Sequence, residues 1–432
     1  MLTGRKYRLA FTPEQAEFAG SIAGICRSVW NTALEQRREY RRRGAWINYH
    51  EQAGQLVDAK TDHRWLKLAP SHALQQTLMD LDRACREHGT FRVKWRSVRR
   101  WSPSFRFPAG DQITVERLGK RWGRCKLPKF GWVRFRWSRP LGGAVRSATV
   151  SSDGHHWSVS FVVDDGRITP GRHPCATAVG VDRGVVVALA CSDGTLRDRQ
   201  FRTSGEARRY RALQKQLSRR HKGSVNTKKT IAAMRRIKRR ERDRRSDFVS
   251  WTANRLTTRH TLVALEQLKT RNMTASAKGT VEQPGSNIRQ KAGLNRSILD
   301  KGWYKFESAL HNAARYTGTT IVKVSAAYTS QRCSVCRMVD PESRESQAVF
   351  RCTTCGFTDN ADVNAAKNIL ADGLSVSACG DFGIARSVKQ ELGGNPRGVT
   401  TPTTVEVSWN PEASARGGRQ LVERLARETA SR

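Results

Sequence analysis

The 432-residue sequence has few acidic residues for the number of its basic ones, and this shortage limits the classes of protein to which it can belong. Only 38 Asp and Glu residues accompany 78 Lys and Arg residues, which leaves a formal charge of +40 at pH 7. In a compact body such a charge repels itself unless a polyanion neutralises much of it. We therefore expect nucleic acid to be the main partner of this protein.

Long apolar runs are also missing and no amphipathic anchor segment is present, so a membrane partner is not expected. The first residues, MLTGRKYRLAF, lack the apolar stretch of a signal peptide, which predicts a reducing, cytoplasmic location. In that compartment the ten cysteines do not imply five disulfides. The length and the 38% hydrophobic content predict a globular protein with more than one domain.

The first part of the chain changes from helical to β character. Residues 1–11 predict one strand, and Thr12-Pro13-Glu14-Gln15 combines an N-cap, a first-turn proline and a residue that closes a capping box. Apolar residues then recur at helical spacing, which predicts a small helical bundle over residues 12–88. Residues 89–172 alternate in short runs between Gly, Pro and Asp turns, which predicts a β domain that we expect to be a barrel.

Two apolar segments after residue 173 each end in a carboxylate. The strand that begins at Ala178 ends at Asp182 and leads into a second strand. Ribonuclease-H-like α/β sheets begin in this way, although an acidic turn residue in any α/β hairpin gives the same fragment. The segment from His260 ends at Glu266, and a lone buried carboxylate is unfavourable unless it faces a partner, a metal ion or water. Both acids are therefore candidate site residues.

A strongly basic helical segment, residues 203–258, separates these two acids. Charge runs usually form solvated helix faces. Here apolar residues precede and follow a crowd of cations that extends from Arg235 to Arg245. We expect the middle of the segment to project from the body and to contact phosphate groups.

Four cysteines form the most specific motif of the sequence. The pairs Cys333 and Cys336, and Cys352 and Cys355, are separated by 15 residues, a spacing that lets four thiolates surround one tetrahedral zinc ion. Two disulfides or two redox pairs are the alternatives, and a reducing compartment disfavours both. Four thiolates leave no open position, so the zinc is expected to be structural. The other cysteines are expected to be small apolar residues: Cys26, Cys85, Cys125, Cys175, Cys191 and Cys379.

A third candidate carboxylate follows the cysteines. On a helix, Asp362 shares one face with Ala365 and Ala366, and the two alanines allow that face to approach a sheet closely. This approach would bring Asp362 toward the acids at the strand ends. Phosphodiester hydrolysis uses two divalent ions roughly 4 Å apart, held by hard oxygen ligands. The three acids Asp182, Glu266 and Asp362 fit that need and are predicted to be catalytic.

Taken together, these features resemble the TnpB family, transposon-encoded relatives of the type V CRISPR effectors, over roughly residues 5–370. The resemblance implies an RNA-guided DNA endonuclease of a prokaryotic mobile element, associated with the nucleoid. Its guide RNA would derive from the transposon end or from a CRISPR-like transcript, and double-stranded target DNA would be selected by base pairing beside a short motif that the protein reads. The segments that carry the likeness are Thr12-Pro13-Glu14-Gln15, Asp247-Phe248, Ala292 to Leu299, Thr329-Ser330-Gln331 and Asp362-Val363-Asn364-Ala365-Ala366.

The resemblance also implies a fold and a set of metal ligands. The fold is multidomain α+β: a ribonuclease-H-like (RuvC) α/β nuclease domain with an inserted four-cysteine zinc ribbon, and a β-barrel wedge domain carrying an inserted helical bundle. Asp182, Glu266 and Asp362 become the ligands of two Mg²⁺ ions. The expected boundaries are 1–11 for the first wedge strand, 12–88 for a helical recognition lobe, 89–172 for the wedge barrel, 173–328 for the nuclease domain with its basic insertion at 203–258, 329–358 for the zinc ribbon, 359–373 for the final nuclease helix and 374–432 for a mostly disordered tail.

Two residues depart from the family pattern without removing a ligand. Arg337 stands where glycine commonly follows the first cysteine pair, which implies a small change of turn. Arg183 follows the first acid, where an apolar residue is more common, and is expected to tune the site electrostatically. Nucleic-acid contacts are harder to assign, because each cation is as readily a solvated surface residue. The best group mixes charge with aromatic rings: Arg92, Lys94, Arg96, Arg99 and Arg100 around Trp95 and Trp101.

Two other functions remain open beside RNA-guided cutting. A guided DNA-binding protein or repressor would keep the fold without cutting DNA. Loss of one of the three carboxylates would favour that function. All three acids are present, which favours an enzyme. An unguided, structure-specific nuclease would act without RNA. The oligomeric state, the guide sequence and the adjacent DNA motif have no signature in the chain.

Overall fold

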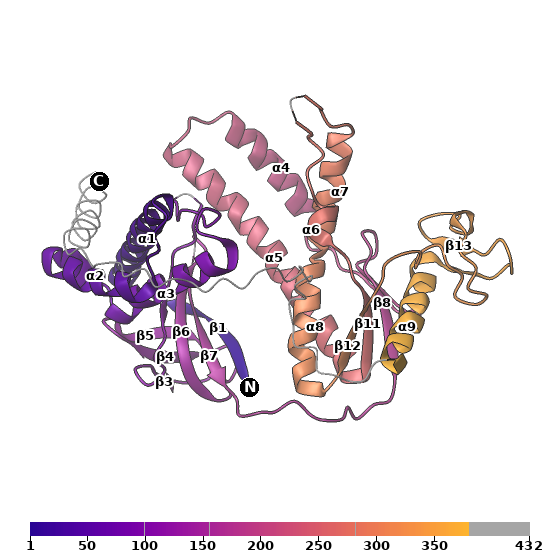
Figure 1. Cartoon of the computed structure of the whole chain (residues 1–432), viewed down its shortest axis with the longest axis horizontal. Coiled ribbons are helices and arrows are strands. Elements are labelled where there is room, and N and C mark those ends of the chain that lie inside the picture. The colour runs from indigo at the N-terminus through magenta and orange to yellow at the C-terminus, as the bar shows by residue number, and fades with distance from the viewer. Residues whose placement is uncertain (99, 155, 281, 380–432) are drawn as a thin grey trace, which may run out of the picture. The chain divides into compact units, whose positions relative to one another are not determined.

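The computed structural model describes residues 1–379 except Arg99, His155 and Val281 (Figure 1). The described residues form two compact units, the first comprising Met1–Arg167 and the second beginning at Ile168. None of the helices described is long and apolar enough to cross a membrane.

The first unit joins three long helices to a seven-stranded sheet with the strand order β2-β6-β7-β1-β5-β4-β3. Its strands pair in antiparallel fashion, and β1 lies between β7 and β5. This order does not by itself close the sheet, so the barrel stays a prediction. The elements are β1 (Leu2–Ala10), α1 (Pro13–Arg42), α2 (Tyr49–Asp62), the 3₁₀ helix η1 (Arg64–Leu68), α3 (Ser71–His88), β2 (Ser104–Phe107), β3 (Thr114–Arg117), β4 (Trp122–Leu127), β5 (Gly131–Arg136), β6 (Ala144–Ser152) and β7 (Trp157–Asp164).

Local sequence signals explain where these elements begin and what they bury. The Thr12 hydroxyl accepts the Gln15 N–H while the Gln15 side chain accepts the Thr12 N–H, so the predicted capping box is present. Alternate residues of the strands face inward, and one continuous core joins the helices to the sheet. Phe130 links the two layers, because its ring stacks on Phe11 and meets Phe18 of α1.

The second unit contains a five-stranded sheet with the order β10-β9-β8-β11-β12. Strands β8, β11 and β12 are parallel, and β9 is antiparallel to both of its neighbours. The elements are β8 (Ala178–Asp182), β9 (Leu189–Cys191), β10 (Leu196–Arg197), α4 (Ser204–Ser218), α5 (Val225–Arg259), β11 (Leu262–Glu266), α6 (Thr270–Met273), α7 (Ile288–Lys301), α8 (Trp303–Thr317), β12 (Thr320–Val324), the 3₁₀ helix η2 (Pro341–Ser343), β13 (Val349–Arg351), β14 (Thr358–Asn360) and α9 (Ala361–Cys379).

The two faces of this sheet are covered by different helices (Figure 1). Because successive strand residues point to opposite faces, Val179 and Val181 of β8 pack with apolar residues of α5 and α8. On the other face, Ala264 of β11 packs with Ile369 of α9. The same alternation directs Asp182 and Glu266, the last residues of β8 and β11, to the α9 face.

Helix α9 approaches the sheet at backbone distance. A Cβ atom added to Gly180 would lie 2.1 Å from the carbonyl oxygen of Ala366, and one added to Gly373 would lie 2.5 Å from the Cβ of Ala264. Ala365 and Ala366 are both buried, so the predicted small-residue face is confirmed. Small residues on both partners thus fix the position of the helix that carries Asp362.

Two glycine positions divide the helices of the second unit, and one expected helix end needs correction. The basic segment breaks near Gly223 and forms a hairpin of α4 and α5. Gly302 adopts the left-handed conformation and separates α7 from α8. Helix α9 continues to Cys379 instead of ending at residue 373. Gly373 does not end the helix, because its role is to allow close packing against Ala264. The rest of the expected tail, from residue 380, lies outside the described residues.

We predict that Gly180→Ala destabilises the second unit by about 1–3 kcal/mol, the usual range for overpacking a tight contact. The added methyl group has to push α9 away from β8, because its neighbour is backbone rather than a flexible side chain. Chemical denaturation measures the change. Gly293→Ala is the matched control, since a Cβ at this α7 position meets nothing within 4 Å. Equal unfolding midpoints for the two variants would contradict the close approach.

Candidate active site and metal centre

The three predicted carboxylates come from three elements that meet at the carboxyl ends of the parallel strands. Asp182 ends β8 and Glu266 ends β11, and the parallel pairing of Val181 with Leu265 places the two acids on neighbouring strands. Asp362 lies in the first turn of α9, and its Oδ2 would be 3.7 Å from a Cβ atom at Gly184. The structure therefore brings all three acids to one end of the sheet.

The surroundings raise the pKa of two of these acids. Burial, followed by the charges of Glu266 and Asp362, raises the pKa of Asp182 from 3.8 to about 7. Burial also raises the pKa of Glu266. Two neighbouring carboxyl groups that resist ionisation form a site that a cation would stabilise. The donor set consists of hard oxygens, which suits a divalent ion such as Mg²⁺.

Two further side chains contact the acids directly. The hydroxyl of Thr329 donates a hydrogen bond to Oε1 of Glu266, and Thr329 is buried. Nη2 of Arg344 lies 3.2 Å from Oδ1 of Asp362. The positive charge of Arg344 also lowers the pKa of Asp182, so the guanidinium acts on two of the three acids. Arg344 thus partly balances the negative charge of the site.

The side chain of Arg183 lies on the opposite face of the sheet from the three acids, because successive residues of a strand point to opposite faces. Its guanidinium is buried, donates to the carbonyl oxygen of Glu266 and pairs with Glu307 of α8 at 3.2 Å. Its charge lowers the pKa of Glu266, against the larger effect of burial. The expected electrostatic influence is therefore present, but Arg183 acts from the opposite side of the sheet.

The four cysteines of the ribbon form one compact cluster. All four Sγ atoms lie within 4.8 Å of one another, with 3.7 Å between Cys333 and Cys355 and 3.5 Å between Cys336 and Cys352. Tetrahedral zinc with Zn–S bonds of about 2.3 Å requires sulfur atoms roughly 3.8 Å apart. The N–H of Cys355 donates to Cys352 and is the main reason that the pKa of Cys352 is lowered to about 6. The cluster fits a structural zinc ion.

The two cysteine pairs end in the same backbone conformation. Arg337 after the first pair and Gly356 after the second both have positive φ, 68° and 71°. Glycine adopts this conformation without cost, whereas other L-residues are disfavoured by roughly 1–2 kcal/mol. The substitution noted at Arg337 therefore changes the residue but not the turn. Arg337 also contacts Asn368 of α9, at 3.2 Å from Nη1 to Oδ1.

Two asparagines of α9 attach the ribbon to the helix that carries Asp362. Asn364 accepts the N–H of Ser334 at 2.9 Å and donates to the carbonyl oxygen of Arg332 at 2.8 Å. Asn368 donates to the carbonyl oxygens of Thr329 and Arg332. Both amides are fully buried. Polar groups so buried must be satisfied, so these bonds fix the first cysteine pair against α9.

The basic hairpin uses part of its charge internally. Glu206 of α4 pairs with Arg240 and Arg244 of α5, and Arg244 is the main cause that lowers the pKa of Glu206 to about 2. Glu241 likewise pairs with Arg202 and Arg245. Ten further cations of the hairpin are exposed and form no ion pair within the described part of the chain: Arg208, Arg209, Arg211, Lys215, Arg219, Lys222, Lys228, Lys229, Arg235 and Arg236.

The other residues predicted to contact nucleic acid also include both internally packed and exposed side chains. The guanidinium of Arg96 lies 3.7 Å from the ring centre of Trp30, and burial lowers its pKa to about 10, which marks a packing role. Arg92, Lys94, Arg100 and Trp95 are exposed, and their contact with nucleic acid stays a prediction. Arg99 lies outside the described residues.

Sequence reasoning missed the partners of the acids. Thr329 was noted only as part of a family segment, and Arg344 was not singled out at all. Thr329 lies four residues before Cys333, a position that gives a weak signal. Arg344 lies in the irregular segment between the two pairs, where no periodicity or spacing points to a role. Of the other cysteines, Cys26, Cys85, Cys125 and Cys191 are buried as expected, Cys175 is half-buried, and the side chain of Cys379 lies outside the description.

Comparisons with known proteins agree with this architecture. Three family models match: "Helix-turn-helix domain" over residues 1–45, "Probable transposase" over residues 160–277 and "Cas12f1-like, TNB domain" over residues 303–369. The solved structure titled "Cryo-EM structure of the Cas12f1-sgRNA-target DNA complex" aligns over 83% of both chains with a TM-score of 0.51 and 14% identity. The fold is therefore of the class that includes Cas12f1.

Two curated relatives identify the family within this fold class. A relative from Escherichia coli (strain K12), named "Putative RNA-guided DNA endonuclease InsQ", is 40% identical over 86% of this chain and 92% of its own length. Another from Streptomyces pristinaespiralis, named "Putative RNA-guided DNA endonuclease", is 31% identical over 87% of this chain and 90% of its own length. The chain belongs to the TnpB family.

We predict that Cys352→Ser removes the zinc and unfolds the ribbon, because structural zinc sites supply the folding free energy of such small modules. Metal analysis of the purified chain should find one zinc per wild-type chain and less in the variant, with a lower melting temperature. Cys175→Ser is the control, since Cys175 lies outside the cluster. Asn368→Leu separates the two roles of the ribbon, because it should keep the zinc and still destabilise α9 by about 1–3 kcal/mol. A zinc-free variant that melts and cuts as wild type would contradict the prediction.

The raised pKa of Asp182 predicts how stability depends on pH and on Mg²⁺. Without metal, the free energy of unfolding should fall as pH rises from about 4 to about 7, because the folded chain retains a proton that the unfolded chain has released. Mg²⁺ at ten times its Kd should add about 1.4 kcal/mol above pH 7 and less at pH 6, where the proton competes. Melting curves with and without MgCl₂ at pH 6 and pH 8 measure the difference. The Asp182→Asn variant should show no such difference between the two pH values. An equal Mg²⁺ effect at both pH values in the wild type would argue against a metal site at the three acids.

Proposed function

We propose that the chain is an RNA-guided DNA endonuclease of a mobile element, which cuts target DNA by metal-dependent phosphodiester hydrolysis. In this proposal a guide RNA pairs with one DNA strand, and the protein reads a short adjacent motif. The observation that carries the proposal is the meeting of Asp182, Glu266 and Asp362 at one end of the sheet, where burial and the charges of the other two acids raise the pKa of Asp182. The two curated relatives that match most of the chain carry names of this activity.

The three carboxylates would hold two Mg²⁺ ions in a RuvC-type, ribonuclease-H-like site. Bound divalent ions supply an activated water and stabilise the charge on the departing oxygen. The chain contributes the geometry: Gly180 admits α9 to the sheet, and Thr329 orients Glu266 through its hydrogen bond. Arg344 is placed to neutralise charge that develops on a phosphate beside Asp362.

The same proposal assigns roles to the larger parts of the chain. The sheet of residues 173–328 with its final helix forms the nuclease domain, the ribbon of residues 329–358 holds zinc, and the first unit combines a wedge domain with a helical recognition lobe. The formal charge of +40 supports two nucleic-acid partners, and the unpaired cations of the α4–α5 hairpin provide part of that surface.

The alternatives differ in observable ways. A guided DNA-binding protein that does not cut would not need the three acids, and the retained trio favours cutting. An unguided nuclease would cleave branched or other structured DNA without RNA. Sequencing the RNA that co-purifies with the chain separates these two nucleases, because a guided enzyme should retain one recurring RNA and an unguided one a mixed population.

We expect Asp182→Ala to abolish cleavage of double-stranded target DNA by the purified ribonucleoprotein in Mg²⁺ and to leave target binding unchanged. The substitution removes a metal ligand without touching the basic surfaces. Arg344→Ala should lower kcat by at least tenfold, since one positioned donor is typically worth 10²–10³. Gel assays of cleavage and of binding on the same DNA give both readouts. Glu282→Ala, an exposed acid outside the site, is the control. Undiminished cutting by Asp182→Ala would refute the assignment of the acids.

A further inference from the structure

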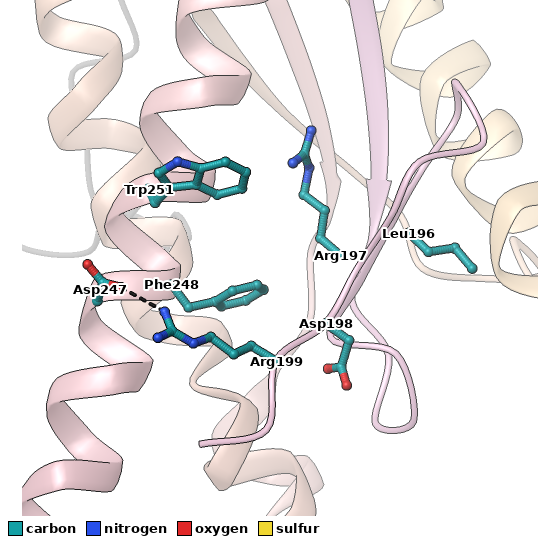
Figure 2. A pocket seen from close by; sticks show the side chains of 7 residues that line it. All are labelled: Leu196, Arg197, Asp198, Arg199, Asp247, Phe248 and Trp251. Atoms are coloured by element: carbon teal, nitrogen blue, oxygen red, sulfur yellow. Dashed lines mark hydrogen bonds and ion pairs between the residues drawn. The ribbon is translucent and has the colours of Figure 1, made fainter. Parts of the chain in front are cut away.

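A cavity of about 470 Å³ lies between α5 and the chain around β10 (Figure 2). Its size is within the range of ligand pockets in proteins. Arg197 and the rings of Phe248 and Trp251 extend into it, and Arg199 and Asp247 meet at its rim, with 2.7 Å between Nη1 and Oδ2. None of these residues belongs to the proposed nuclease site.

The charges of this cavity do not cancel. Asp247 is neutralised by Arg199, and Asp198, which also lines the cavity, pairs with Lys301 at 2.6 Å. Arg197, whose side chain extends into the cavity, forms no ion pair with any described residue. Its positive charge is therefore left without a counter-charge at the cavity wall. The cavity therefore suits an anion.

The aromatic wall of the cavity is only partly covered. Trp251 is 54% exposed, and the guanidinium groups of Arg197 and Arg255 each lie 5.4 Å from its ring centre. By contrast, Arg41 on Trp46 and Arg96 on Trp30 lie at 3.8 and 3.7 Å, where the two planes are in contact. A flat group can thus stack on Trp251 while an anion approaches Arg197. Phosphate joined to a base has this chemistry.

The cavity lies on the opposite face of the sheet from the three acids. Arg197 pairs with Leu189 of β9, which packs with the α5 core, whereas Asp182 is directed to α9. A strand held in the cavity is consequently not the strand at the acids. The cavity instead follows the basic hairpin along α5, because Phe248 and Trp251 are the next turn after Arg245. A nucleic acid that lies along the hairpin reaches Trp251 without passing the acids.

We propose that this cavity binds one unpaired nucleotide of the resident RNA, with the base stacked on Trp251 and a phosphate bound by Arg197. The inference rests on the proposed function, which supplies a permanently bound RNA. A resident RNA is favoured over target DNA because the cavity continues the basic hairpin along α5, on the opposite face of the sheet from the acids.

The test uses Asp182→Ala protein and the RNA that co-purifies with the chain, transcribed in vitro and labelled for binding titrations at several salt concentrations. Trp251→Ala should weaken RNA binding at least fivefold, the lower limit for loss of one base stack, and leave the salt dependence unchanged. Trp251→Phe should retain most of the affinity. Arg197→Gln should weaken binding and reduce the slope of log Kd against log salt by about 0.7, the value for one phosphate contact to a single strand.

Crosslinking identifies the bound strand. RNA that contains 4-thiouridine should give an adduct at Trp251 in the complex of the same protein, and target DNA that contains 4-thiothymidine should not. Tyr304→Ala, an exposed aromatic residue of the same unit without a cation on its ring among the described residues, is the control for both measurements. Unchanged RNA affinity of Trp251→Ala, or an adduct with DNA alone, would overturn this proposal and leave the guided function standing. The absence of any co-purified RNA would overturn both. These measurements do not depend on DNA cleavage. A negative result would therefore count against the nucleotide cavity and not against the catalytic role of the three acids.

Discussion

The contact of α9 with the parallel sheet is the constraint on which the rest of the second unit depends. Gly180 and Ala366 bring two backbones together, and this contact decides where Asp362 lies relative to Asp182 and Glu266. Three like charges are then held close in a partly buried place, against their mutual repulsion. Packing energy from the apolar face of α9 holds together an arrangement that electrostatics alone would separate.

The sequence was most informative where spacing alone determines geometry. Two Cys-x-x-Cys pairs and a run of small residues before Ile369 each define a distance, and the structure has both the sulfur cluster and the close helix. Strand ends were predicted because apolar runs stop at Asp182 and Glu266. Gly302 and Gly373 were less informative, because glycine can either end a helix or allow a close helix–sheet contact. Only tertiary packing decides which of the two occurs.

Arginine was the hardest residue to interpret from the sequence. Arg244 and Arg245 lie within a charge run and serve internal ion pairs, Arg96 lies in a basic and aromatic segment and is stacked on Trp30, and Arg344 lies in an irregular segment and reaches an acid. The side chain is long and has several donors, so its target can be many residues away in sequence. Charge counts therefore predict the kind of partner correctly while the role of each cation depends on its surroundings.

The ribbon contributes more to the acid site than a scaffold would. Its first cysteine pair is hydrogen-bonded to α9 through Asn364 and Asn368, and the segment between its pairs supplies Arg344. A chain that has not acquired its metal would thus lack both a well-placed Asp362 and the neighbouring guanidinium. Under the proposed function, newly made copies would therefore be unable to cut DNA until they had bound zinc. Zinc supply would then decide when the protein becomes a competent nuclease.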